Sequence, residues 1–163
     1  MEFTIDRMQA GDWAQVKSVY LEGIATGNAT FETGVPDWSG WNASHLPSGR
    51  LVARNDKSII GWAALSQIST RPVYSGVAEV SVYVAAAARG SGVGHALLSK
   101  LIEESERAGV WTLQAGILPE NIASLSLHKR CGFREVGRRD RLGKLNGAWR
   151  DVILLERRSQ IVG

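Results

Sequence analysis

A chain of 163 residues with 44% hydrophobic and 21% charged side chains has the composition of an ordinary globular protein, and we expect a single domain over residues 1–163. The net charge of +3 is too small to indicate nucleic-acid binding, and no apolar run is long enough to span a membrane. The only cysteine, Cys131, excludes an intramolecular disulfide framework, and the lack of a signal peptide makes a cytoplasmic location the default expectation.

Strands and helices alternate along the first half of the chain. Phe3 and Ile5 alternate with polar neighbours, which is typical of a strand, whereas Val16 and Val19 recur at helical spacing. The segment over 29–34 fits neither period and is either a packed loop anchored by Phe31 or part of an acceptor pocket. The patterns predict strands over 3–7, 51–53, 59–68 and 77–84, a helix from residue 12 to about residue 24, and a short helix over 37–46.

The second half continues this alternation. A helix that begins near Val93 carries Val93, Leu97 and Leu101 on one face, which is typical of a helix packed on a sheet, and Gly109 ends it. We then expect a strand over 111–117, a helix over 121–130, strands over 133–138 and 148–156 joined by a polar, glycine-containing loop, and a flexible tail over 157–163.

The stretch from Arg89 to Gly94 reads R-G-S-G-V-G and lies between the strand that ends at Val84 and the helix that begins near Val93. The free backbone N–H groups and positive dipole end of a helix start attract anions, and glycines let a phosphate approach the backbone closely. The spacing matches neither the dinucleotide fingerprint G-x-G-x-x-G nor the phosphate loop G-x-x-x-x-G-K-[ST]. The R-x-x-G-x-G pattern therefore predicts a cradle for a different pyrophosphate, with a plain tight turn as the alternative.

The strand over 77–84 carries an unexpected carboxylate. Glu79 shares one face with Ser81 and Tyr83, whereas the other face is uniformly apolar. Such a carboxylate is either paired with a cation, for example Arg71, or it is the base that removes a proton from an ammonium substrate, directly or through water. Burial would raise the pKa of Glu79 and strengthen it as a base.

Polar side chains on a helix of the second half each admit two interpretations. Asn121 is an ordinary helix cap or a cofactor contact, and Ser124, one turn further along, could reach the same cofactor. His128 is a structural histidine or a general acid, because imidazole titrates near neutral pH. Cys131 is more simply a small buried residue than a nucleophile.

Two motifs together resemble the GCN5-related N-acetyltransferase superfamily: R-x-x-G-x-G over 89–94, and N-x-x-S-x-x-L-H-x-x-x-G-F over 121–133. A wider set resembles the phosphinothricin and methionine sulfoximine acetyltransferase branch. This set comprises T-F-E-T over 30–33, R-P-x-Y over 71–74, A-E-V-S-V-Y-V over 78–84 and G-x-W-x-D-V over 147–152. The tryptophan-rich stretch over 36–49 does not match the pattern of the branch, and its role is left open.

The resemblance implies an α/β fold of the α+β type, in which a mixed, mostly antiparallel sheet is flanked by helices. It implies acetyl-CoA as the cofactor, no metal, Glu79 as the base and His128 as the acid. The residues implied to bind acetyl-CoA are Val82, Tyr83, Val84, Arg89, Gly90, Ser91, Gly92, Val93, Gly94, His95, Asn121 and Ser124. Those implied to shape the acceptor pocket are Phe31, Glu32, Arg71, Pro72, Val73 and Tyr74, with Arg71 suited to an α-carboxylate. The branch is typically homodimeric.

We therefore predict an N-acetyltransferase that moves acetyl directly from acetyl-CoA to the primary amine of a small amino-acid-like acceptor, such as phosphinothricin, methionine sulfoximine or methionine sulfone. The alternatives are an acetyltransferase for a protein N-terminus, lysine or aminoglycoside, and a non-catalytic acyl-CoA-binding module. Nucleic-acid binding would rest on the basic cluster of Arg138, Arg139, Arg141 and Lys144, for which a solvated hairpin is the simpler interpretation. We expect a small-molecule amine as partner, and neither nucleic acid nor a membrane.

Overall fold

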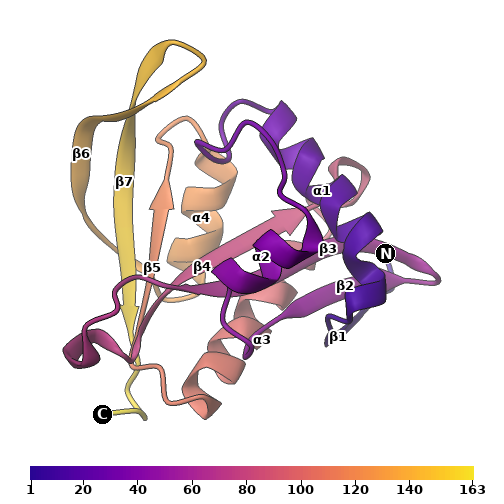
Figure 1. Ribbon diagram of the computed structural model, residues 1–163, viewed down its shortest axis with the longest axis horizontal. Coiled ribbons are helices and arrows are strands. Elements are labelled where there is room, and N and C mark those ends of the chain that lie inside the picture. The colour runs from indigo at the N-terminus through magenta and orange to yellow at the C-terminus, as the bar shows by residue number, and fades with distance from the viewer.

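The computed structural model describes residues 1–163 and contains one seven-stranded sheet with helices on both faces (Figure 1). The strand order is β1-β2-β3-β4-β5-β7-β6, and neighbouring strands are antiparallel except for the parallel pair β4 and β5. This arrangement confirms the predicted fold class. The strands are β1 (Thr4–Arg7), β2 (Leu51–Asn55), β3 (Ser58–Gln67), β4 (Val77–Val84), β5 (Thr112–Ile117), β6 (Arg134–Leu145) and β7 (Ala148–Arg158). The helices are α1 (Trp13–Ala25), α2 (Trp38–Ser44), α3 (Val93–Arg107) and α4 (Ile122–Arg130), with short 3-10 turns η1 (Ala10–Asp12), η2 (Pro72–Tyr74) and η3 (Ala86–Ala88).

Different helices cover the two faces of the sheet because side chains alternate along the strands. On β2 and β3, Leu51, Ala53 and Leu65 join the core with α3, whereas Val52 and Trp62 join a second core with α1 and α2. The apolar stripe predicted for α3 is confirmed, since its residues are buried in the larger core. No helix combines the length and the apolar character needed to cross a membrane.

The two halves of the sheet separate between β4 and β5. These parallel strands pair only over Val77–Glu79 and Thr112–Gln114, although β4 continues to Val84. The last part of β4 therefore has no strand on this side, and its backbone groups are free to bind a ligand. The hairpin of β6 and β7 stands on one side of this opening and α1 on the other (Figure 1).

The β6–β7 hairpin is longer than predicted. The segment predicted as a loop, from residue 139 to 147, is mostly strand, because Gly143–Leu145 pairs with Ala148–Arg150. Asn146 and Gly147 have positive φ angles of 50° and 82° and form the two-residue turn that matches the twist of a hairpin. The Asn-Gly pair is a hairpin signal in itself, but the polar residues around it lack the apolar alternation that indicates a strand.

The end of the chain is held against the sheet, which differs from the expected flexible tail. Strand β7 runs to Arg158, two residues beyond its predicted end. The buried Ser159 donates its hydroxyl to Glu106 of α3 at 2.5 Å, and its backbone N–H to the carbonyl of Trp111 at 2.8 Å. Residues 157–159 are therefore part of the folded structure: Arg157 and Arg158 belong to β7, and the polar groups of the buried Ser159 have hydrogen-bond partners.

Candidate active site

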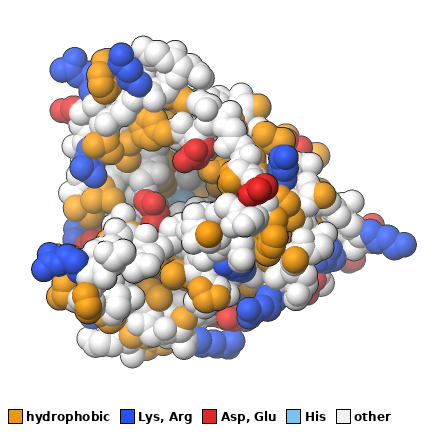
Figure 2. Space-filling model, viewed as in Figure 1, with side chains coloured by type: hydrophobic (Ala, Val, Ile, Leu, Met, Phe, Trp, Pro, Cys, Tyr) orange, Lys and Arg blue, Asp and Glu red, His pale blue; other side chains and the backbone are white.

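Two adjoining cavities open where β4 and β5 separate. The larger, called the cleft below, has a volume of about 720 Å³, and the smaller, called the pocket, has about 390 Å³. Figure 2 shows this hollow, with acidic side chains around it and a histidine at its floor. A ligand in the cleft would meet a ligand in the pocket at the residues that line both cavities, which are Ala29, Val82, Tyr83, Asn121 and Ser124.

The predicted pyrophosphate loop lines the cleft. Gly90 and Gly92 have φ angles of 78° and 88°, in the left-handed region that favours glycine, and a Cβ at either position would meet nothing within 4 Å. Gly92 immediately precedes α3, so the free N–H groups of the first helical turn lie at the cleft. Arg89 also lines the cleft, and its Nε donates to the carbonyl of Val84 at 3.3 Å. This geometry can bind an anion.

The side chains of two predicted members of this loop do not line the cleft. The hydroxyl of Ser91 donates to the carbonyl of Ala88, and the side chain of Val93 is buried in the core. Neither residue is among those that line the cleft. Gly94 and His95 line the cleft as predicted, and a Cβ at Gly94 would lie 3.2 Å from a methyl group of Leu127 on α4.

The unpaired end of β4 forms one wall of the cleft. Val82, Tyr83 and Val84 all line it. The ring of Tyr83, however, packs into the aromatic cluster beneath α1, with its centroid 4.9 Å from that of Trp62 and 4.8 Å from that of Tyr20. Burial raises the pKa of Tyr83, so its phenol stays protonated. This strand therefore offers backbone groups to a ligand, while the Tyr83 side chain holds the strand against α1.

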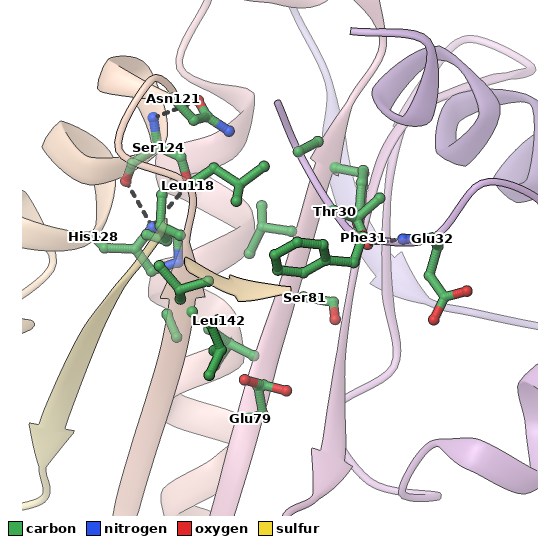
Figure 3. Close-up of a pocket in the computed structure, with 18 residues that line it drawn as sticks. Thr30, Phe31, Glu32, Glu79, Ser81, Leu118, Asn121, Ser124, His128 and Leu142 are labelled. Carbon is green, nitrogen blue, oxygen red and sulfur yellow. Dashed lines mark hydrogen bonds between the residues drawn. The ribbon is translucent and has the colours of Figure 1, made fainter. Parts of the chain in front are cut away.

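Helix α4 places three predicted residues at the cavities. Asn121 caps the helix, because its Oδ1 accepts the backbone N–H of Ser124 at 3.2 Å. His128 lines the pocket, and its Nδ1 lies 2.7 Å from the carbonyl oxygen of Ser124 (Figure 3), which places the proton on Nδ1. Burial lowers the pKa of His128, so the ring is neutral near pH 7. Its Nε2 is then a proton acceptor rather than a donor.

Glu79 is half-buried in the wall of the pocket. Burial raises the pKa of this carboxyl above its ordinary value of 4.5, and a hydrogen bond with Gln114 opposes that shift. Pairing with Arg71 is wrong as an explanation of Glu79, because the Arg71 guanidinium lies over the ring of Tyr74, 5.5 Å from its centroid. Gly116 of β5 lies beside this carboxylate, since a Cβ at Gly116 would lie 3.8 Å from Oε1 of Glu79, at ordinary van der Waals distance.

The loop after α1 closes the pocket from the opposite side. Phe31 packs in a small apolar cluster with Leu118, Leu145 and Val152, and it also lines the pocket. Figure 3 shows the ring of Phe31 projecting across the pocket, with Glu32 beyond it. The two interpretations of this loop are therefore compatible, since the same side chain is both packed and exposed to the cavity.

The other predicted acceptor residues lie elsewhere. Arg71, Pro72, Val73 and Tyr74 form the exposed turn η2 before β4 and do not line the pocket of this chain. The pocket of the single chain therefore gives no support to the expectation that they shape it, because η2 lies at the end of β4 opposite to the opening. The pocket is lined by two carboxylates and by no lysine or arginine.

Two features left open by the sequence prove to be structural. Within the tryptophan-rich stretch, Trp38 and Trp41 pack against Trp13, with ring centroids 5.8 Å and 5.7 Å from it, and this stretch lines neither cavity. Cys131 packs beside the larger core and lines neither cavity, and burial raises the pKa of its thiol, which argues against a nucleophile.

Several lining residues were not predicted from the sequence. Some of them adjoin the motifs: Glu120 precedes Asn121, and Ser126 lies one helical turn beyond Ile122 on the same helix. Their position next to or within the motif over 121–133 could have indicated that they line the cleft. Others come from segments remote in sequence and carry no local signal. The missed residues include Thr26, Asn28, Glu120, Ser126 and Arg130 in the cleft and Leu118, Leu142 and Val152 in the pocket.

The sequence of this chain is similar to those of known acetyltransferases. The model of the acetyltransferase (GNAT) family matches residues 15–133, a span that holds the glycine-rich loop, Glu79 and His128. The phosphinothricin N-acetyltransferase of Alcaligenes faecalis is 34% identical over 161 residues, covering 94% of this chain and 81% of that protein. The L-methionine sulfoximine/L-methionine sulfone acetyltransferase of Salmonella typhimurium is 33% identical over 106 residues, covering 65% of this chain and 62% of that protein.

A solved structure is similar over nearly the whole chain. It is a GNAT superfamily phosphinothricin acetyltransferase from Sinorhizobium meliloti in complex with acetyl-CoA. The TM-score is 0.85 at 28% identity, and the superposition covers 97% of this chain and 89% of that one. The similarity therefore extends over nearly the whole fold of this chain.

Proposed function

Since this chain belongs to the acetyltransferase (GNAT) family and is an acetyl-CoA-dependent N-acetyltransferase, we propose that its acceptor is the primary amine of a small amino-acid-like molecule. Relatives named for phosphinothricin and for methionine sulfoximine and sulfone support this acceptor class. The observation that carries the proposal is the small pocket, which adjoins the cleft at shared residues and contains Glu79.

The cleft fits acetyl-CoA, which supplies an activated acetyl thioester. The anion-binding start of α3, Gly90, Gly92 and Arg89 suit its pyrophosphate. The unpaired backbone of Val82–Val84 suits the amide groups of the pantetheine arm, because an extended ligand can continue the hydrogen bonding of a strand edge. In this arrangement the thioester lies between the cavities, near Asn121 and Ser124.

The acidic pocket suits an acceptor that arrives as an ammonium. Glu32 and Glu79 supply negative charge, and Phe31, Leu118 and Leu142 supply apolar surface. Glu79 removes the ammonium proton, directly or through water, and burial has raised its pKa toward that of a useful base. The neutral amine then attacks the acetyl carbon, and a backbone N–H near Val84 polarises the carbonyl oxygen. As the C–S bond breaks, the nitrogen loses its second proton to solvent, and the amide forms.

The departing sulfur of coenzyme A takes its proton from solvent or from His128. A thiol pKa of about 8.5 makes the thiolate a fair leaving group without an acid. His128 was predicted as that acid, but its neutral ring, with the proton on Nδ1, would first have to gain a proton at Nε2. We therefore assign the base to Glu79 and give His128 at most an auxiliary role.

The charge of the pocket favours a second candidate acceptor. Because no lysine or arginine lines the pocket, nothing in the single chain balances the α-carboxylate of an amino acid there. A simple amine without a carboxylate meets no such difficulty. Arg71 remains the predicted partner of an α-carboxylate, and the homodimer expected from the resemblance also remains a prediction.

Release of free thiol from acetyl-CoA, measured with a panel of amines, tests the proposal. The panel contains phosphinothricin, methionine sulfoximine, methionine sulfone, common amino acids, simple alkylamines, a peptide and an aminoglycoside. Turnover confined to phosphinothricin, the sulfoximine and the sulfone supports the amino-acid-like acceptor, whereas a preference for alkylamines selects the second candidate. Turnover of the peptide or aminoglycoside alone contradicts both.

A further inference from the structure

Arg150 links three segments of the chain that are far apart in sequence. It lies on β7, its side chain is only 16% exposed, and its guanidinium reaches out of the hairpin toward the loop after α1. Nη1 donates to the carbonyl of Gly27 at 2.8 Å, and Nη2 donates to Oδ1 of Asn28 at 2.6 Å. Nη2 also lies 3.3 Å from Oε2 of Glu120, just before α4.

The partners of Arg150 lie at the border of both cavities. Asn28 and Glu120 line the cleft, and their chain neighbours Ala29 and Asn121 line the cleft and the pocket. Arg150 therefore joins the two sides of the opening, with α1 and its loop on one side and α4 on the other. No second side chain makes comparable contacts to both Asn28 and Glu120.

The contact with Gly27 also holds the chain just after α1. Gly27 follows the C-cap residue Thr26, so its carbonyl lies outside the helix and needs a partner of its own. The carbonyl of Gly27 lies two residues beyond the last residue of α1 and accepts from Arg150. Two residues further along, the chain enters the segment Ala29–Glu32 that walls the pocket.

The bond to Asn28 has a further consequence for the cleft. Because Oδ1 of Asn28 accepts from Arg150, the remaining amide NH₂ group of Asn28 is the part left to donate to a ligand in the cleft. The planar guanidinium can hold the Gly27 carbonyl, the Asn28 amide and the Glu120 carboxylate at one time, which an ammonium group cannot do with the same geometry.

We propose that Arg150 is a positioning residue, which holds the loop 27–32 against the Glu120 segment and so shapes the acceptor pocket. The inference rests on the proposed function, because it assumes that the acceptor binds in that pocket. The pyrophosphate loop at 89–94 makes no contact with Arg150, so the anion-binding end of the cleft does not depend on it, whereas Asn28 and Glu120 connect Arg150 to the rest of the cleft.

Steady-state kinetics with phosphinothricin and acetyl-CoA test the inference on Arg150→Ala, Arg150→Lys and Arg134→Ala. Arg134 is the matched control, because it pairs with Glu156 on the same hairpin and lines neither cavity. Loss of the charged hydrogen bonds in Arg150→Ala should raise KM for phosphinothricin about tenfold and change kcat less than about threefold, with a smaller rise in KM for acetyl-CoA because Asn28 and Glu120 also line the cleft. Arg150→Lys should restore part of the loss, since lysine keeps the charge opposite Glu120.

Hydrogen exchange separates failure of this inference from failure of the proposed function. Arg150→Ala should speed exchange of the amides at 24–28, and Arg134→Ala should not. If wild-type enzyme acetylates none of phosphinothricin, methionine sulfoximine and methionine sulfone, the acceptor proposal fails, and the exchange experiment still decides whether Arg150 holds the loop. Unchanged exchange at 24–28 overturns the inference. So does a KM for phosphinothricin that Arg150→Ala leaves at the wild-type value, even if the variant melts at a lower temperature.

Discussion

At the scale of single residues, one physical cause acts on both ionisable groups of the pocket. Burial disfavours the charged form of either group, so it raises the pKa of Glu79 and lowers the pKa of His128. The two shifts have opposite consequences for basicity: Glu79 becomes a stronger base, whereas His128 becomes a weaker base than an ordinary imidazole. As an acid, His128 would need a protonated ring, which burial disfavours.

Glu79→Gln removes the proposed base while keeping nearly the same shape. We expect kcat to fall about 100-fold, in the range typical of a lost general base. Wild-type kcat should decline as the pH falls through the pKa of Glu79, at a pH above 4.5, because only the carboxylate accepts a proton. The glutamine variant should lack this decline. A pH–rate profile at saturating acceptor measures both effects, and an unchanged profile would remove Glu79 from the mechanism.

The same substitution has an opposite expected effect on stability. A carboxyl whose pKa is raised on folding contributes stability below its unfolded pKa, and this contribution is lost as the pH rises through its folded pKa. At pH 7 the charged Glu79 therefore costs stability, and Glu79→Gln should melt at the same temperature as wild type or higher. A lower melting temperature would indicate that the carboxylate stabilises the fold. The kcat of Glu79→Gln would then have to be calculated per folded molecule.

His128→Asn tests the auxiliary role given to His128. Since the thiolate can leave unassisted, kcat should fall less than about tenfold, clearly less than for Glu79→Gln. Presteady-state thiol release at neutral pH, compared between the two variants, provides the measurement. A loss for His128→Asn as large as that for Glu79→Gln would show that the imidazole takes part in proton transfer.

At the scale of elements, the unit of β4, the glycine-rich loop and α3 determines where an anion can bind. Gly92 and Gly109 stand at opposite ends of α3, both with positive φ and both with open space around a Cβ. An alanine at either position should therefore cost a similar unfolding free energy through backbone strain, but only Gly92 lines the cleft. This pair separates the conformational role of a glycine from its role in binding.

Gly92→Ala and Gly109→Ala should each cost about 1–2 kcal/mol of unfolding free energy, because alanine is strained at positive φ. Only Gly92→Ala should also raise KM for acetyl-CoA, by about tenfold or more, because its Cβ enters the space that a pyrophosphate needs. Chemical denaturation and acetyl-CoA titration measure the two quantities. Equal KM values for the two variants would argue against the cleft as the pyrophosphate site.

At the scale of the whole molecule, segments from both ends of the chain close the site. The loop after α1 and the β6–β7 hairpin meet through Phe31, Val152 and Arg150, while β4 and α4 form the opposite walls. The hairpin is held in turn by the end of β7, where Ser159 and Arg157 both contact Glu106 of α3. The last residues of the chain thus support the sheet from outside the site.

Ser159→Ala tests this support. The side chain of Glu106 is only 13% exposed, and the substitution removes its hydroxyl donor and leaves Arg157 at 3.6 Å. We expect a loss of about 1–3 kcal/mol of unfolding free energy, the cost of leaving a buried charged group short of a partner. KM values below the melting transition should stay at wild-type levels, because Ser159 lines neither cavity. Thermal unfolding of both proteins, followed by kinetics, makes the comparison.

The sequence by itself determined the element order and the fold class, and it predicted the glycine-rich loop that lines the cleft. Its periodic patterns report which face of each element is apolar, and the glycine-rich loop is a local motif whose three glycines, strand and helix start are contiguous in the chain. The acceptor half depended on tertiary structure. Leu142 and Arg150 reach their positions only after the hairpin folds beside α1, and the Arg71 turn lies outside the pocket because β4 carries it to the other end of the sheet. Contacts between remote segments leave no local pattern, so only the packed sheet could decide which side chains face the pocket and what burial does to their charges.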